Sequence, residues 1–384
     1  LFVTSSNIEI NPALTKSDRK VFVKLLWDIY KGDPNWVPPL VMERMDAIDP
    51  NKNPYFEHAQ VRLWIAYKDG KPVGRISAQI DELVPKYHGI NTGHFGFFDC
   101  IDDQKVANAL FDTACNWLRE NGMVEVIGPF SFSINEETGL LVEGFDTPPR
   151  LLMGHSRPYF EKLVLNSGLK KVKDTWAYTL DISKPILPPV MQKLVTRAVE
   201  KGQVTFRPIN MDKYEEELKL ILDIFNDAWI DNWKYIPFTE AELDHAVKEL
   251  KMIIREDFTY IAEIDGVPQA MMVTLPNINE IIKDLDGKLF PFGVLKLLWR
   301  LKFKPSFKTV RVPLMGVRKE YQNSRLSGIM SLGLFEACRQ TATAIGVEEA
   351  ELSWVLEENT RLSKLLETVG CVKYKTYRLF QKDL

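Results

Sequence analysis

The fold is decided by a stretch that begins with VRVPLMGV at residues 310–317, an apolar run typical of a buried β-strand. The polar segment RKEYQNSRLSG follows at residues 318–328, and a helix through Leu334 and Ala342 is expected after it. This part of the chain therefore predicts a strand, a polar turn and a helix in that order.

The same pattern continues to the end of the chain. EAELSWVL at residues 349–356 predicts a second buried strand, Asn359 begins another helix, and Gly370 ends it. Residues 372–380 alternate between apolar and polar side chains with a period of two, which predicts a closing strand.

This order of elements resembles the acyl-CoA-binding half of the GNAT superfamily of N-acyltransferases. Gln322 matches the Arg or Gln that opens the family's pyrophosphate loop, and Asn359 matches the Asn that starts the helix beside the pantetheine arm. Four residues fit the closing pattern of the family: Leu362, Leu365, Glu367 and Gly370. The resemblance implies acyl-CoA as a substrate and an amine as the acceptor.

Two positions depart from the family pattern. Arg325 stands where the loop usually has its first Gly, and Leu366 stands where many members carry a general-acid Tyr. Both departures favour an alternative in which the chain keeps the fold as a non-catalytic ligand-binding protein.

The composition is that of a globular protein with room for two domains. The chain has 384 residues, 45% of them hydrophobic and 26% charged, with a formal net charge of −3. This charge gives no overall attraction to nucleic acid, so no nucleic-acid partner is expected.

Cysteine and histidine usage predicts neither disulfides nor a metal site. Cys100, Cys115, Cys338 and Cys371 are scattered without a CxxC motif, and the five His residues lack ligand spacing. We therefore expect reduced core thiols and a cytoplasmic location. The start LFVT at residues 1–4 has no signal-peptide pattern, and no apolar run is long enough for an integral membrane segment.

An internal repeat predicts a tandem duplication. The hairpin turn Asp69-Gly70 recurs as Asp265-Gly266, and two later matches follow in the same order. The predicted fold class is α/β (α+β), with two tandem GNAT-like domains, each a twisted mixed sheet flanked by helices. The expected ranges are 1–183 for the first domain, 184–202 for a Pro-rich linker with a short helix, and 203–384 for the second domain.

Only the second copy is expected to hold the cofactor. In the first copy Asp102, Asp103 and Gln104 take the place of the phosphate loop, and two carboxylates there would repel a pyrophosphate. The first helix of that copy is predicted from Ser17, as N-cap, to residue 32.

The second copy has a strand-to-helix loop of the kind that binds phosphate through backbone N–H groups. Arg325 can compensate for the missing Gly, because a guanidinium pairs well with phosphate oxygens. An ordinary solvated turn is the alternative. The candidate cofactor-binding residues are Met315, Gly316, Val317, Gln322, Asn323, Ser324, Arg325, Leu326, Ser327, Gly328 and Asn359.

Catalytic candidates lie on or just after the strand at 349–356. Period two puts Glu351 and Ser353 on one face, where Glu351 is a candidate base and Ser353 a candidate acid or orienting hydroxyl. Glu357 is the third candidate. The alternative is that Glu351 is exposed at the start of the strand and that Glu357 only complements a helix dipole. Tyr321 and Tyr374 are further sources of a phenol.

An insertion between two strands of the second copy is basic and aromatic. Residues 287–319 contain nine Lys or Arg residues and no Asp or Glu, interleaved with Phe, Trp and Leu. Such a segment, here 288–304, can make peripheral contact with a membrane or cover a ligand. The simpler interpretation is a helix that packs its apolar stripe on the domain.

A second long loop, residues 133–158, either contributes to an acceptor site or acts as a structural clasp. The leading function is acyl-CoA-dependent N-acyltransfer (acetyl-CoA or another acyl-CoA) to a small-molecule or peptide amine. The mechanism is direct attack on the thioester, with no metal. A Fem-type aminoacyl transferase is a further alternative.

Overall fold

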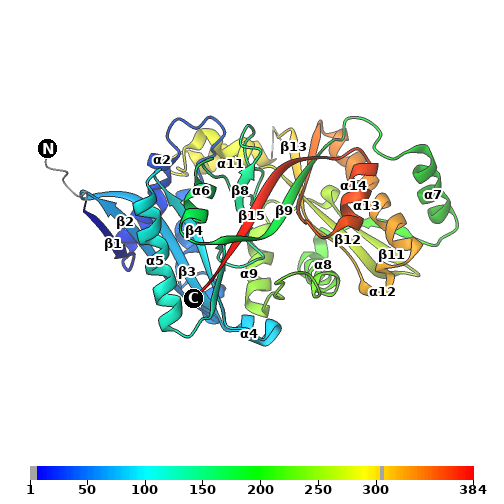
Figure 1. The fold of residues 1–384 in the computed structure, drawn as a ribbon. Coiled ribbons are helices and arrows are strands. Elements are labelled where there is room, and N and C mark those ends of the chain that lie inside the picture. Colours follow the sequence, from blue (N-terminus) through cyan, green and yellow to red (C-terminus); the bar gives the residue numbers. More distant parts are fainter. Residues whose placement is uncertain (1–6, 303–306) are drawn as a thin grey trace. The chain divides into compact units, whose positions relative to one another are not determined.

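The computed structural model describes residues 7–302 and 307–384, which fall into two compact units (Figure 1). Unit 1 comprises Leu1–Thr175, Ile282–Leu297 and Lys375–Leu384, and unit 2 comprises Trp176–Ile281 and Leu298–Tyr374. The predicted ranges 1–183 and 203–384 are contiguous, whereas these units are not. The start at residues 1–4, together with Phe303 and Lys304 of the basic insertion, lies outside the described residues.

Unit 1 is built on a sheet in the order β1-β2-β3-β4-β5-β15. Its strands are β1 (Ile8–Pro12), β2 (Ala59–Lys68), β3 (Lys71–Asp81), β4 (Thr92–Cys100), β5 (Glu125–Gly128) and part of β15 (Val372–Asp383). Neighbours pair antiparallel in this part of the chain, except that β4 and β5 are parallel. Helix α5 (Gln104–Glu120) buries its apolar face on β2 and β3.

The first helix begins earlier than predicted. Thr15, not Ser17, is the N-cap of α1 (Lys16–Lys24), because the Thr15 side chain accepts from the Asp18 N–H while Asp18 reaches back to the Thr15 N–H. This capping box satisfies two N–H groups that Ser17 could not reach in the same way.

The two hairpin turns confirm the repeated Asp-Gly signal. Asp69 and Gly70 have φ values of 51° and 76°, and Asp265 and Gly266 have the same values. Positive φ at both central residues defines the type I′ turn that connects two strands directly. The two turns join β2 to β3 and β11 (Thr259–Ile264) to β12 (Val267–Pro276).

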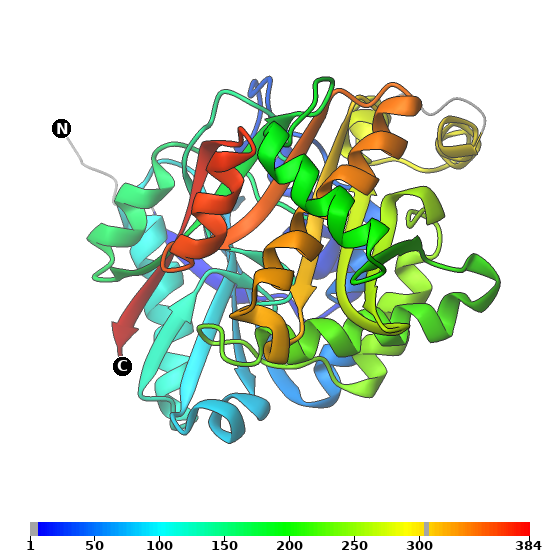
Figure 2. The same ribbon diagram turned by 90° about the vertical axis from the view of Figure 1, so that its right-hand side faces the viewer.

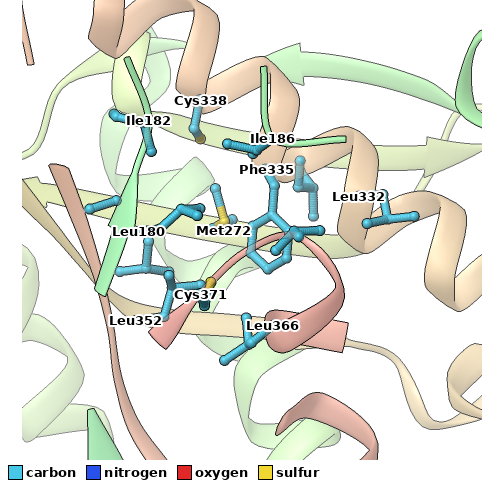
Figure 3. Close-up of a cluster of buried hydrophobic side chains, with 14 of the residues drawn as sticks. Leu180, Ile182, Ile186, Met272, Leu332, Phe335, Cys338, Leu352, Leu366 and Cys371 are labelled. Atoms are coloured by element: carbon cyan, nitrogen blue, oxygen red, sulfur yellow. The ribbon is translucent and has the colours of Figure 1, made fainter. Parts of the chain in front are cut away.

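Unit 2 has a second mixed sheet with helices on both faces. From β14 (Glu349–Leu356) the order runs through β13 (Thr309–Val317), β12 and β11 to β10 (Thr205–Pro208), and only β13 and β14 pair in parallel among these described strands. Helix α13 (Arg325–Ala344) packs on one face, where Figure 3 shows Met272, Phe335 and Leu352 pointing into one apolar cluster. Helix α8 (Tyr214–Trp229) packs on the other face.

Alternation along the strands separates the two faces. Val310 and Val312 join the α13-side core, so Arg311 between them points to the α8 side. Gly316 also lies against α8, since a Cβ there would come within 2.9 Å of the Ala228 Cβ.

Two long strands contribute residues to both units. β9 (Lys170–Asp181) begins in unit 1 and its last residues, from Trp176, belong to unit 2, while β15 begins in unit 2 and its last residues, from Lys375, belong to unit 1. Phe380–Asp383 of β15 pairs with β5, and Phe380 lies in the unit 1 core. Each sequence copy therefore gives its final strand partly to the unit built mainly from the other copy.

The remaining elements complete the two units. Helices α2 (Leu26–Ile29), α3 (Val41–Ala47), α4 (Leu83–His88) and α6 (Phe160–Asn166), the turn η1 (Pro54–Glu57) and strands β6 (Phe130–Ser131), β7 (Glu137–Thr138) and β8 (Leu140–Glu143) precede β9. They are followed by α7 (Pro189–Glu200), η2 (Met211–Lys213), α9 (Glu240–Leu250), η3 (Glu256–Phe258), α10 (Asn279–Ile282), η4 (Lys283–Leu285), α11 (Gly293–Lys302), α12 (Lys319–Gln322) and α14 (Thr360–Thr368), the red helix of Figure 2.

The loop at 133–158 packs within unit 1. β8 pairs with Thr376–Arg378, and the buried Lys375 ammonium donates to the carbonyls of Gly144 (2.5 Å) and Thr147 (2.8 Å). These contacts attach the loop to the last strand of unit 1, and both interpretations of the loop stay predictions.

The end of β15 belongs to unit 1, so a substitution near the C-terminus should act on that unit. Phe380→Ala should destabilise unit 1 by about 3–5 kcal/mol, because it leaves a cavity beside β5. Hydrogen exchange followed by mass spectrometry should show loss of protection in β4 and β5. Val372→Ala, at an exposed position of the same strand, is the control. Loss of protection confined to α13 and α14 would contradict the assignment of Phe380 to the core of unit 1.

Candidate active site in the C-terminal copy

The parallel ladder between β13 and β14 is short. Thr309–Val312 pairs with Glu349–Leu352, and both strands then continue for four or more residues without further pairing to each other in the described chain. Pro313 comes directly after the last pair and has no N–H to donate. We call this place the fork: the end of the ladder together with the separate strand ends 313–317 and 353–356.

A buried polar network occupies the base of the fork. Arg311 and Glu351 are register partners across the ladder, and the Arg311 Nε lies 3.8 Å from the Glu351 carboxylate. Arg311 Nε donates to Ser353 Oγ (2.8 Å), and its Nη2 donates to the Ser353 carbonyl (3.1 Å). Ser353 Oγ donates to Glu351 Oε1 (2.5 Å), and the Tyr374 hydroxyl donates to Glu351 Oε2.

Burial makes this network energetically important. The exposed fraction is 0% for Glu351, 4% for Ser353 and 5% for Arg311, whereas Tyr374 is only half-buried. A carboxylate without water needs a nearby cation and hydrogen-bond donors to stay charged. Arg311, Ser353 and Tyr374 supply these, so the expectation of an exposed Glu351 is wrong.

The structure brings together two of the three catalytic candidates. Glu351 and Ser353 share one face and a hydrogen bond, as their spacing predicts. Glu357 lies beyond the end of β14, and the strand from Glu351 to Leu356 alone extends about 16 Å.

The sequence names Tyr374 only as a further source of a phenol, and it does not select Arg311, which falls in the basic insertion. The register of β13 and β14 brings Arg311 to Glu351, because it pairs positions 40 residues apart. The placement of β15 brings the Tyr374 hydroxyl to the same carboxylate. Tyr374 also supplies a phenol, whereas Leu366, at the usual Tyr position, is fully buried in the α13-side core.

Two helix N-termini lie side by side in unit 2. Ser324 caps α13 by accepting from the Ser327 N–H (3.3 Å), and Asn359 caps α14 by accepting from the Leu362 N–H (3.1 Å). Arg361, an exposed residue in the first turn of α14, donates to Asn323 Oδ1 (3.1 Å) and so links the two ends. The positive ends of two helix dipoles and one guanidinium thus meet there, an arrangement that attracts phosphate.

Gly328 leaves room at the first turn of α13. A Cβ built at this position would meet nothing within 4 Å. Arg325 is exposed in the same turn, so a second guanidinium lies beside the two helix ends.

The other cofactor candidates have mainly structural contacts. The Gln322 amide donates to the carbonyls of Ala228 (3.1 Å) and Val317 (3.0 Å), and Leu326 packs against the α13-side core. Met315 accepts at its carbonyl from Trp229 Nε1 (3.1 Å), and Gly316 lies against α8. Trp229 also packs edge-on against Trp354, with ring centroids 5.4 Å apart, so an aromatic pair lies between α8 and β14.

The first copy has a different helix start at the equivalent place. Asp103 caps α5 and pairs with Lys68 Nζ (2.6 Å), and this hydrogen bond lowers the pKa of Asp103 below its usual value. Gln104 donates to Asn108, to the Leu163 carbonyl and to Ser167. A carboxylate of the chain itself therefore occupies the position that a phosphate would take.

In the first copy the ladder between β4 and β5 also ends early, and the backbone of that copy fills the space beyond its end. β4 and β5 pair only from Thr92 to His94, and Gln79 Nε2 donates to the carbonyls of Phe130 (2.8 Å) and Phe132 (3.0 Å). A Cβ at Gly96 would lie 1.8 Å from the Phe130 carbonyl oxygen, so the backbone packs directly against this glycine.

The thiols are free and buried, as their flanking residues predict. Burial raises the pKa of Cys338 and of Cys371 to about 12, and it raises that of Cys100 and Cys115 as well. Within residues 7–302 and 307–384, no three His, Cys, Asp or Glu side chains are grouped to hold a metal ion. No helix in that part of the chain has the length and apolarity to cross a membrane.

A cavity of about 30 Å³ lies under α13, lined by residues such as Met272, Phe335 and Leu352 (Figure 3).

The burial of the network predicts a large cost for removing its cation. Arg311→Met should lower the free energy of unfolding by about 3–5 kcal/mol, because it leaves the Glu351 carboxylate buried without its cation. Adding Glu351→Leu should restore part of the loss. Lys308→Met, which breaks an exposed pair with Glu348 just before β13, should change the free energy of unfolding by about 0–1 kcal/mol. Equal effects of Arg311→Met and Lys308→Met in denaturant titrations would contradict the buried network.

Comparisons with known structures agree on the fold. A tandem GNAT protein from the clavulanic acid biosynthesis pathway aligns with a TM-score of 0.58 at 11% identity, over 98% of both chains. A GCN5-related N-acetyltransferase from Sphaerobacter thermophilus aligns with a TM-score of 0.54 at 13% identity, over 98% of this chain and 95% of its own. The chain has the tandem GNAT fold, as the sequence predicts.

Comparisons with curated sequences are more specific. No protein-family model matches the chain. The chain is 44% identical over 382 residues to the bacterial ceramide synthase of Caulobacter vibrioides, which covers 99% of both chains. It is also 44% identical to protein YghO of Escherichia coli, over 97% of this chain and 94% of that protein. Identity at this level over the full length shows that the chain belongs to the family of the Caulobacter ceramide synthase and YghO.

Proposed function

We propose that this protein transfers a fatty acyl group from acyl-CoA to the amine of a long-chain amino alcohol, which gives an amide of the ceramide class. The observation that carries the proposal is the 44% identity, over 99% of both chains, to the bacterial ceramide synthase. A ceramide is the amide of a fatty acid and a long-chain amino alcohol, so its synthesis from acyl-CoA is an N-acylation. The tandem GNAT fold is suited to that chemistry.

The adjacent N-termini of α13 and α14 are the proposed cofactor site. Arg361 and Arg325 carry positive charge there, and Gly328 leaves space for a pyrophosphate. Asn359 orients the first turn of α14 through its cap. The cofactor binds only the second copy in this proposal, because Asp103 occupies the corresponding helix end in the first.

The network at the fork is the proposed proton acceptor. The amine must lose a proton before its nitrogen attacks the thioester carbonyl; the C–N bond then forms, the C–S bond breaks, and CoA leaves as a thiolate that takes up a proton. Glu351 is fully buried, whereas Tyr374 is only half-buried, so we assign the contact with the amine to the Tyr374 hydroxyl. Tyr374 accepts the amine proton as it passes its own proton to Glu351, and the same pair returns a proton to the thiolate.

Arg311 and Ser353 act as positioning residues in this scheme. Arg311 lies beside the Glu351 carboxylate and donates to Ser353, and Ser353 holds the Oε1 atom so that Oε2 faces Tyr374. Loss of either should affect the rate more than the binding of acyl-CoA.

Turnover tests this proposal directly. The purified protein with hexadecanoyl-CoA and a long-chain amino alcohol such as sphinganine should yield one amide and one CoA thiol per cycle, measured by mass spectrometry and thiol titration. The buried, high-pKa cysteines should give little background in the titration. Glu351→Gln and Tyr374→Phe should each lower kcat by about 10²–10⁴-fold with an unchanged Kd for acyl-CoA.

Two outcomes would contradict the proposal. Binding of acyl-CoA without amide formation from any amine would indicate a ligand-binding protein on the same fold. Full activity of Tyr374→Phe would remove the proton relay while leaving acyl transfer intact. Lys373→Ala, at an exposed neighbour on the same strand, is the matched control.

The cofactor site has its own prediction. Gly328→Glu should weaken acyl-CoA binding at least tenfold, because it places a carboxylate at the helix end where the pyrophosphate binds. Gly328→Ala should fold normally and bind with near wild-type affinity, since its methyl group meets nothing within 4 Å. Calorimetric titration of both variants measures this, and equal affinities would exclude this helix end as the site.

A further inference from the structure

The apolar side of α11 faces solvent. Its helix and the turn before it carry five large apolar side chains with high exposed fractions: Phe290 (71%), Phe292 (75%), Leu295 (65%), Leu298 (43%) and Trp299 (60%). Elsewhere in the described chain, exposed apolar side chains form smaller groups, such as Val190 with Leu194 on α7. The interpretation that this helix packs its apolar stripe on the domain is wrong for these residues.

Helical spacing gathers these side chains into one stripe. Phe292, Leu295 and Trp299 are separated by three and four residues, so they lie above one another on consecutive turns. Leu298 lies next to Trp299 at the border of the stripe. We call Phe290, Phe292, Leu295, Leu298 and Trp299 the apolar ridge.

Polar contacts hold the helix with the ridge outward. Lys296 Nζ pairs with Asp284 (2.5 Å), and Arg300 Nη1 donates to the Ile281 carbonyl (2.5 Å). A Cβ at Gly293 would lie 2.4 Å from the Lys288 carbonyl oxygen, so the turn into the helix is tight. Val294, Leu297 and Arg300 are half-buried, so the side of the helix that carries Leu295 and Trp299 faces away from the protein.

The charge around the ridge is positive. Residues 283–304 contain six Lys or Arg residues and two Asp, in a chain whose formal net charge is −3. Asp284 pairs with Lys296, and Asp286 lies 3.7 Å from Lys288, so both acidic groups are partly neutralised. An apolar, aromatic ridge in a basic segment matches an anionic lipid surface, into which Trp, Phe and Leu insert while Lys contacts the headgroups.

We propose that α11 and its preceding turn are a membrane-docking element that inserts the apolar ridge into the interfacial region of an anionic bilayer. The helix lies in the plane of the surface and does not cross it. This inference does not depend on the proposed acyl transfer. Together, the two would let the protein meet long-chain substrates where they partition.

Site-specific fluorescence tests the insertion. Leu295→Cys gives one exposed thiol in a chain whose native cysteines are buried, so a polarity-sensitive dye can be attached there alone. With vesicles of phosphatidylglycerol and phosphatidylcholine, the emission should shift to the blue and be quenched by lipids brominated on their acyl chains. The same dye at Met252→Cys, an exposed site elsewhere in the chain, should show neither change.

Vesicle co-sedimentation measures the energetics. Phe292→Ser/Leu295→Ser/Trp299→Ser should weaken binding to anionic vesicles at least tenfold, and Val190→Ser/Met252→Ser should leave it unchanged. Lys288→Ala, at an exposed Lys of the turn before the helix, should weaken it about fivefold. Vesicles of phosphatidylcholine alone should bind weakly.

Three results would overturn the proposal. One is unchanged vesicle binding by the triple Ser variant. Another is no vesicle binding by the wild-type protein. The third is a dimer, seen by light scattering, that the same triple Ser variant abolishes, because the ridge would then contact a second copy of the chain. None of these results depends on turnover, so they are distinguishable from a failure of the proposed acyl transfer.

Discussion

The buried contact between Arg311 and Glu351 is the interaction on which the candidate site depends. It joins β13 and β14 one residue before their ladder ends, and Ser353 and Tyr374 complete the hydrogen bonds of the carboxylate. A buried charge pair of this kind adds little net stability compared with apolar residues, but removing one partner is costly. Its position at the base of the fork fits the role of proton acceptor that we propose for it.

In both copies the parallel ladder ends after a few residue pairs, but different groups lie beyond its end. In the first copy Gln79 and the Phe130–Phe132 backbone fill the space, and Asp103 closes the helix end with its own carboxylate. In the second copy the helix ends of α13 and α14 carry Arg side chains and an open Gly328. In the function that we propose, the first copy serves as a scaffold for the second. The exchange of β9 and β15 means that neither sequence copy contains a complete unit.

The sequence predicted most of the elements, and it did so for local reasons. Asp-Gly turns and strand alternation each depend on neighbouring residues, and the structure has both. The network needed information that is not local. Glu351 and Ser353 were found by period two, but Arg311 required the β13–β14 register and Tyr374 required the placement of the last strand. Strand exchange and the outward ridge of α11 likewise depend on tertiary contacts that no short window of sequence contains.

The central claim is that one cofactor site remains, at the helix ends of the second copy. The number of acyl-CoA molecules bound per chain, measured by equilibrium titration of the wild-type protein, tests it most directly. The account predicts one molecule per chain, and a chain with Asp103→Asn, which removes the carboxylate of the first copy, should still bind one. Two molecules per wild-type chain, or none at millimolar acyl-CoA, would contradict the division of roles between the copies.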